Sequence, residues 1–91
     1  MNESIVGVVV TFNRLDLLKN CITSLKRQTR SLDQIIVVNN GSTDGTEKWL
    51  NEQQGLIVIH QENSGGAGGF HRGMKEGYEH NYDWIWVMDD D

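Results

Sequence analysis

The chain has 91 residues, of which 37% are hydrophobic and 23% are charged, a composition typical of a globular domain and unlike that of disordered or fibrous proteins. Its formal net charge of -5 at pH 7 argues against nucleic acid as the main partner. The single cysteine, Cys21, excludes an internal disulfide, and no apolar run is long enough for a transmembrane segment. We therefore expect one domain over residues 1–91 of a cytoplasmic protein.

Four short apolar segments predict β-strands. The first of them, SIVGVVVT, is rich in β-branched residues and lacks strict alternation, which is typical of parallel strands covered on both faces. The predicted strands are residues 4–11, 33–39, 56–61 and 84–88. The last segment, WIWVM, is apolar on both faces, so we expect a core strand there.

Helices are predicted between these strands. Residues 15–29 form an amphipathic pattern, in which the apolar side chains recur at helical spacing. The apolar residues of this pattern are Leu17, Leu18, Cys21, Ile22 and Leu25. Residues 42–53 predict a second helix, whose start is marked by Asp44 with Glu47 three residues later.

A glycine-rich segment, NSGGAGG at residues 63–69, predicts a loop, and residues 70–80 predict a third helix weakened by Gly73 and Gly77. Strands that alternate with helices predict a parallel sheet of about four strands in three α/β/α layers. Ligands of such sheets bind beyond the carboxyl ends of the strands. Four polar or glycine-rich segments converge at that edge, namely residues 11–14, 39–44, 63–70 and 89–91.

Three adjacent carboxylates, those of Asp89, Asp90 and Asp91, end the last strand. They repel one another unless a cation binds, and oxygen ligands without His or Cys favour Mg²⁺ or Mn²⁺. Because side chains alternate along a strand, Asp89 and Asp91 point to one side and Asp90 to the other. The pattern predicts a metal site at Asp89 and Asp91, with a solvated acidic tail as the alternative.

Other polar residues of the same edge have two interpretations each. The glycine-rich segment matches neither a Walker A loop nor a dinucleotide fingerprint, so it predicts either a close approach of the backbone to a ligand or a flexible turn. Arg14 and Arg72 are suited to phosphate or to pairing with a surface acid. Asn39 and Asn40 are suited to a nucleobase edge, although Asn-Gly is also a common turn dipeptide.

Taken in series, five segments resemble the amino-terminal half of family 2 glycosyltransferases of the GT-A fold. The segments are VVVTFNR, CITSLKRQT, IIVVNNGSTDGT, NSGGAGGFHRG and WVMDDD. The resemblance covers nearly the whole chain, and the terminal acids look like the DxD motif of that family. The fourth and fifth segments are most similar to the galactofuranosyltransferase branch, and rhamnosyltransferases are close competitors.

The resemblance implies a Rossmann-like half that binds a nucleoside diphosphate sugar, UDP- or dTDP-linked. Thr11 and Phe12 would lie beside the nucleobase, and Asn39 stands where the family often has an Asp that contacts the base. The predicted donor contacts are Thr11, Phe12, Arg14, Asn39, Asn40, Gly68, Gly69, Arg72 and Asp90. Asp90 would lie nearer the sugar, and Asp89 and Asp91 would hold the metal. No catalytic residue is assigned, because the general base of the inverting enzymes lies beyond the DxD motif.

The implied activity is metal-dependent, inverting transfer of galactofuranose or rhamnose to a glycan or lipid-linked acceptor in cell-wall or polysaccharide synthesis. We expect the chain to be the truncated, donor-binding part of a longer enzyme and to be inactive alone. The full-length protein would be cytoplasmic and peripheral at the inner face of the membrane. The alternatives are a metal-dependent nucleotidyltransferase, a non-catalytic nucleotide-binding module and a structural interaction domain.

Overall fold

The computed structural model describes residues 3–27, 32–63 and 65–90, with the side chain of Asp89 outside the description. Seven elements follow one another in the predicted order. The strands are β1 (Ile5–Thr11), β2 (Gln34–Asn40), β3 (Ile57–Gln61) and β4 (Trp84–Asp89). The helices are α1 (Leu15–Arg27), α2 (Thr46–Asn51) and α3 (Gly65–Glu79). The last two residues of the predicted first helix lie outside the described residues.

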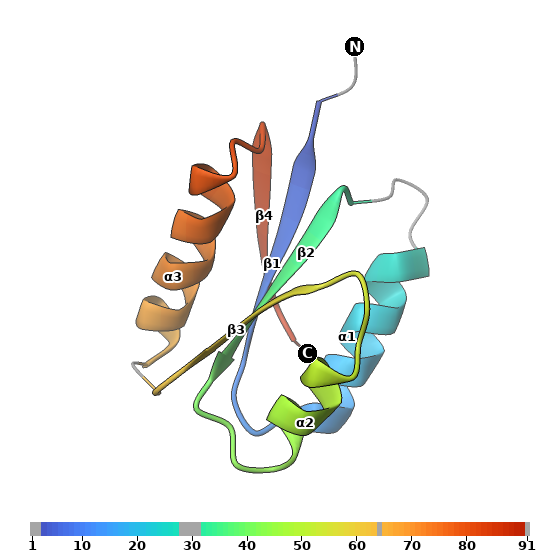
Figure 1. Ribbon diagram of the computed structural model, residues 1–91, viewed down its shortest axis with the longest axis vertical. Coiled ribbons are helices and arrows are strands. Elements are labelled where there is room, and N and C mark those ends of the chain that lie inside the picture. The colour runs from blue at the N-terminus through green and yellow to red at the C-terminus, as the bar shows by residue number, and fades with distance from the viewer. Residues whose placement is uncertain (1–2, 28–31, 64, 91) are drawn as a thin grey trace.

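The four strands form one parallel sheet in the order β3-β2-β1-β4. Helix α3 covers one face of this sheet, and α1 and α2 lie on the other face (Figure 1). The predicted three-layer α/β/α architecture is therefore confirmed. The sheet register pairs Thr11 with Asn39 and Val10 with Asp89, so the ends of β1, β2 and β4 lie side by side.

The core consists of two hydrophobic clusters, one on each face of the sheet. The first lies against α1 and α2 and contains Val9, Leu18, Ile22, Ile35, Val37 and Leu50. The second lies under α3 and contains Val6, Val8, Ile36 and Val38. Successive strand residues point to opposite faces, so the apolar runs at residues 5–10 of β1 and 35–38 of β2 supply side chains to both clusters. This confirms the interpretation of the first apolar run as a strand covered on both faces.

The expectation that the fourth strand is a core strand was wrong. The sheet order places β4 at an edge, beside β1. Trp84 is 54% exposed and Trp86 is 43% exposed. Apolar residues on both faces of a segment indicate a strand, but burial depends on the neighbours that the strand order supplies.

The apolar face of α1 is only partly buried, and the predicted start of the second helix was wrong. Leu17 is 43% exposed, whereas Leu18 and Ile22 are buried on the same helix. Helix α2 begins at Thr46 and not at residue 42, because Gly45 adopts the left-handed conformation, with φ 94°, immediately before it. No helix in the described parts of the chain is long and apolar enough to cross a membrane.

Residues 65–69 of the glycine-rich segment form the first part of α3 and not the predicted loop. This helix begins at Gly65, and its buried residues are Gly69, Gly73 and Gly77. Four residues advance about 6 Å along a helix, and two residues advance about 6.6 Å along a strand. Glycines at every fourth position of the helix can therefore lie opposite every second residue of the strand.

Each of the three buried glycines faces one valine of β1. A Cβ atom at Gly69 would lie 2.6 Å from Val10, and one at Gly77 would lie 3.2 Å from Val6. A Cβ atom at Gly73 would overlap Val8. The glycines therefore allow the backbone of α3 to pack directly on the side chains of β1.

Candidate functional site

A pocket of about 310 Å³ lies at the carboxyl ends of the strands, and we call it the carboxyl-edge pocket. It is lined by Val10, Thr11, Phe12, Arg14, Asn40, Asn63, Gly65, Gly66, Phe70 and Asp90. These residues come from all four segments that the sequence places at this edge. The predicted convergence of the four segments is thus confirmed, and the ligand that they would bind stays a prediction.

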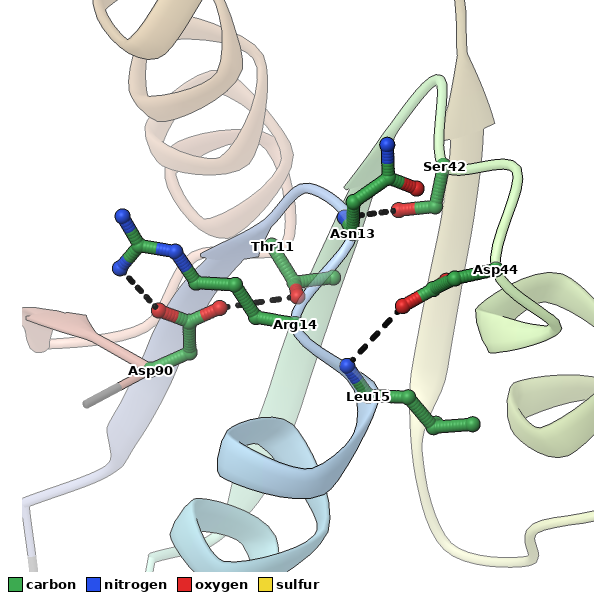
Figure 2. A network of polar contacts seen from close by, with 7 residues as sticks. All are labelled: Thr11, Asn13, Arg14, Leu15, Ser42, Asp44 and Asp90. Atoms are coloured by element: carbon green, nitrogen blue, oxygen red, sulfur yellow. Dashed lines mark hydrogen bonds and ion pairs between the residues drawn. The ribbon is translucent and has the colours of Figure 1, made fainter.

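Asp90 follows β4 and lies against the end of β1. Its Oδ2 accepts a hydrogen bond from the Thr11 hydroxyl at 2.9 Å, and its Oδ1 lies 3.4 Å from Nη1 of Arg14 (Figure 2). Only 5% of the Asp90 side chain is exposed, whereas 52% of the Arg14 side chain is exposed. The carboxylate therefore joins two other predicted donor contacts.

The loop between β1 and α1 is bonded to the loop between β2 and α2. Asn13 adopts a left-handed conformation, with φ 51°, and its backbone N–H donates to Ser42 Oγ at 3.0 Å. In return, the backbone N–H of Thr43 donates to Asn13 Oδ1 at 2.7 Å. Asn tolerates this conformation better than most residues. The sequence analysis assigned no role to Asn13. Its position in a polar segment directly after a strand was the signal that could have identified it.

Asp44 connects the amino termini of the two helices on the same face. One carboxylate oxygen accepts the backbone N–H of Leu15 at 3.1 Å (Figure 2), and the other accepts the N–H of Thr46 at 3.2 Å. The hydrogen bond from the Thr46 hydroxyl, followed by those from the two backbone N–H groups, lowers the pKa of Asp44. Asp44 was predicted to mark the start of the second helix, but α2 begins two residues later, at Thr46, and its cap residue is Gly45.

Asn40 holds the start of α3 next to the end of β2. Its Nδ2 donates to Gly65 O at 2.9 Å and to Asn63 Oδ1 at 3.2 Å, and its Oδ1 accepts from Gln61 Nε2 at 3.1 Å. The residue is only 2% exposed. Asn63 Oδ1 also accepts the N–H of Gly65 at 2.8 Å, so Asn63 was an overlooked signal for an earlier helix start.

Asn39 does not line the carboxyl-edge pocket. Its Oδ1 accepts the N–H of Ser42 at 3.2 Å, and its Nδ2 lies 3.0 Å from Nδ1 of His60. Asn39 and Asn40 are adjacent on a strand and therefore point to opposite faces of the sheet. The structure thus separates these two predicted donor contacts and brings Asn40 to the pocket.

Gly68, Gly69 and Arg72 also lie outside the pocket lining. Because α3 begins at Gly65, all three belong to the helix. Gly69 packs on β1, and Arg72 pairs with Glu76 one turn later, with 3.0 Å between Nη1 and Oε1. Gly65 and Gly66, in the first turn, line the pocket in their place.

The predicted metal ligands can be placed only through the backbone. Asp89 pairs with Val10, a residue of the pocket wall, whereas the Asp89 side chain and all of Asp91 lie outside the described residues. Within the described residues, no group of three or more His, Cys, Asp and Glu side chains could hold a metal ion. Asp89 and Asp91 carry carboxylate oxygens, which are the ligands that Mg²⁺ and Mn²⁺ prefer. Metal binding by these two acids stays a prediction.

A parallel α/β sheet with a pocket beyond its carboxyl ends is the general arrangement of nucleotide-binding α/β proteins. The sequence model of glycosyl transferase family 2 matches residues 7–91. The chain therefore belongs to glycosyl transferase family 2. Membership favours the glycosyltransferase prediction over the nucleotidyltransferase alternative.

Individual relatives agree with this family. The galactofuranosyltransferase GlfT1 of Mycobacterium tuberculosis is 40% identical over 95 residues, which cover 100% of this chain and 31% of that protein. GlfT1 of Mycolicibacterium smegmatis is 35% identical over 91 residues, covering 98% of this chain and 30% of that protein. The chain therefore spans about a third of the length of these relatives.

A solved structure supports the fold independently. The mannosyltransferase PcManGT from Pyrobaculum calidifontis, in complex with GDP-Man and Mn²⁺, matches with a TM-score of 0.69 and 21% sequence identity. The match covers 100% of this chain and 28% of that chain. The predicted Rossmann-like GT-A fold is thus confirmed.

Proposed function

We propose that the chain binds the nucleoside diphosphate sugar donor of a metal-dependent, inverting glycosyltransferase. The observation that carries this proposal is the carboxyl-edge pocket, where polar residues of β1 and β2 and the glycines of the first turn of α3 meet the acid that follows β4. Membership of glycosyl transferase family 2 supplies the reaction class. The relatives named galactofuranosyltransferase favour galactofuranose over rhamnose as the transferred sugar.

Each lining residue has a chemical role in this proposal. Phe12 is 43% exposed at the pocket and offers an aromatic face to the nucleobase of a UDP- or dTDP-linked donor. Arg14 supplies a positive charge for the diphosphate. The first turn of α3 presents Gly65 and Gly66, where no side chain separates the backbone from a ligand.

We further propose that Asp89 and Asp91 hold one Mg²⁺ or Mn²⁺ ion. Support comes from their carboxylate chemistry, from the pairing of Asp89 with the pocket residue Val10, and from the Mn²⁺ in the PcManGT complex. A bound divalent ion would stabilise the negative charge of the departing nucleoside diphosphate. The general base and the binding site for the glycan or lipid-linked acceptor would be supplied by parts of a longer enzyme.

The experiment is a titration of the ¹⁵N-labelled protein with UDP, with and without Mg²⁺, followed through the backbone amide shifts. We expect metal-dependent shifts at residues 11–14, at Asn40 and at residues 63–66. The variants Asp89→Ala and Asp91→Ala should lose the metal dependence. The control Glu79→Ala removes an acid at the far end of α3 and should retain it.

The alternative outcomes are distinct. Metal-dependent shifts that survive in both aspartate variants would contradict the assignment of Asp89 and Asp91, while leaving nucleotide binding intact. The absence of shifts with UDP, dTDP and GDP at millimolar concentration would overturn the proposal that this chain contains the donor site.

A further inference from the structure

We propose that Asp90 is a positioning residue that holds Arg14 in the carboxyl-edge pocket and is not a metal ligand. This inference rests on the proposed donor site. It divides the three terminal acids into two functions, with metal binding by Asp89 and Asp91 and orientation of Arg14 by Asp90. The inference follows from the burial, the partners and the charge of the Asp90 carboxylate.

The sheet register places Asp90 beside Thr11. Val10 pairs with Asp89, so the next residues along the two parallel strands are Thr11 and Asp90. Met88, two residues earlier than Asp90, packs in the cluster that contains Val9, two residues earlier than Thr11. Asp90 and Thr11 therefore point to the same face of the sheet, and their side chains form the 2.9 Å hydrogen bond.

The environment of Asp90 explains why this carboxylate needs Arg14. Thr11 is 1% exposed and Asp90 is 4% exposed, so water reaches neither polar group freely. A buried carboxylate is costly without a compensating charge. The guanidinium of Arg14, 3.4 Å from Oδ1, is the positive charge that lies against it.

These same contacts argue against metal binding by Asp90. Each of its two oxygens already has a partner, namely the Thr11 hydroxyl and the Arg14 guanidinium. A divalent ion on the same carboxylate would lie close to the positive charge of Arg14 and would be repelled by it.

For Arg14, the ion pair supplies a defined position. An arginine side chain has many rotamers, and fixing it in one position costs rotamer entropy. More than half of the Arg14 side chain is exposed, and the residue lines the carboxyl-edge pocket. Asp90 thus anchors one edge of the guanidinium before the anionic donor arrives, which reduces the cost of binding.

The test is a double-mutant cycle on binding of UDP in the presence of Mn²⁺, measured by calorimetry for the wild type, Asp90→Asn, Arg14→Ala and the double variant. We expect each single substitution to weaken UDP binding about tenfold, because each removes the positioned cation. The double variant should be no weaker than Arg14→Ala, because Asp90 acts through Arg14. The enhancement of UDP binding by Mn²⁺ should persist in Asp90→Asn and disappear in Asp89→Asn.

Three results would overturn the inference. The first is that Mn²⁺ no longer enhances UDP binding in Asp90→Asn. The second is that the losses of UDP affinity caused by the two single substitutions multiply in the double variant. The third is that Arg14→Ala binds UDP as tightly as the wild type. The result for Arg14→Ala decides the question even if Asp90→Asn fails to fold. More than half of the Arg14 side chain is exposed, so we expect Arg14→Ala to fold. Wild-type protein that binds no UDP would instead overturn the proposed function, so the two failures are distinguishable.

Discussion

The β1–α1 loop and the first turn of α3 both line the carboxyl-edge pocket, but different interactions hold them in place. The loop is fixed by hydrogen bonds of Asn13 and Asp44 near the protein surface. The helix is fixed by the buried amide of Asn40 and by direct packing of its glycines on β1. Buried contacts contribute more to stability than exposed hydrogen bonds, so we expect the helix side of the pocket to be rigid and the loop side to be adjustable.

The largest effect should come from Asn40→Asp, which leaves the shape of the side chain unchanged. A carboxylate cannot donate to Gly65 O or Asn63 Oδ1, and both oxygens would face a buried negative charge. We expect the free energy of unfolding at pH 7 to fall by about 3 kcal/mol in urea denaturation. The loss should shrink in acid, where the protonated carboxyl group of the variant can donate again.

Asn51→Asp is the matched control for this substitution. Asn51 is exposed, and its Oδ1 is the atom that bonds to His60 Nε2. A carboxylate retains that acceptor, so the same chemical change should alter the stability by less than about 0.5 kcal/mol. Equal losses in the two variants would show that the amide of Asn40 does not hold α3.

A smaller loss should follow from Gly73→Ala, which tests the packing of α3 on β1. The new Cβ atom would overlap Val8, and overpacking of this kind costs about 1–3 kcal/mol. Alanine favours a helix over glycine by about 1 kcal/mol, which offsets part of this cost. We expect a net loss of about 1–2 kcal/mol in urea denaturation.

Gly66→Ala provides the comparison within the same helix. No atom lies within 4 Å of a Cβ at Gly66, so this substitution gains the helix preference without a clash. It should leave the stability unchanged or raise it by up to about 1 kcal/mol. If Gly73→Ala proved as stable as Gly66→Ala, the close packing of α3 on β1 would be refuted.

The smallest effect is expected on the loop side, from Asp44→Asn. Hydrogen bonds lower the pKa of Asp44 in the folded state, so its stabilising contribution is complete above the ordinary value for Asp, about 4. This contribution is lost as the pH falls through the lowered pKa of the folded state. The difference in unfolding free energy between wild type and Asp44→Asn should therefore shrink below about pH 4.

Urea denaturation between pH 7 and pH 3 checks this prediction. Glu52→Gln, at an exposed position after α2, removes one carboxylate without these contacts and controls for net charge. A difference between wild type and Asp44→Asn that stayed constant over the whole range would mean that the Asp44 carboxylate does not connect the two helices.

The sequence predicted the element order, the parallel sheet and the edge at which the polar residues meet. Those features depend on local patterns, such as the β-branched runs of β1 and β2 and the polar residues that follow them. The sequence also identified Thr11, Phe12, Arg14, Asn40 and Asp90 as members of one edge, and all five line the pocket. Their contacts with the donor stay predictions.

The errors arose where contacts distant in sequence decide the outcome. Glycine has a low intrinsic preference for helices, so residues 63–69 predicted a loop, and only the valines of β1 explain the helix. The burial of β4 depends on the strand order, which no local pattern specifies. Asn39 and Asn40 were both assigned to the donor, and only Asn40 lines the pocket, so contact of Asn39 with the donor stays a prediction.

The separation of Thr11 and Asp90 along the chain, 79 residues, has a consequence for the order of folding. Closing so large a loop is entropically unfavourable, and pairing between distant segments slows folding. During synthesis, β1 emerges early, and its pairing with β4 waits until residues 84–89 have left the ribosome. The cation at Arg14 therefore acquires its buried counter-charge only after the other strands and the three helices have been synthesised, so a chain in which β4 is not yet paired has no ordered carboxyl-edge pocket.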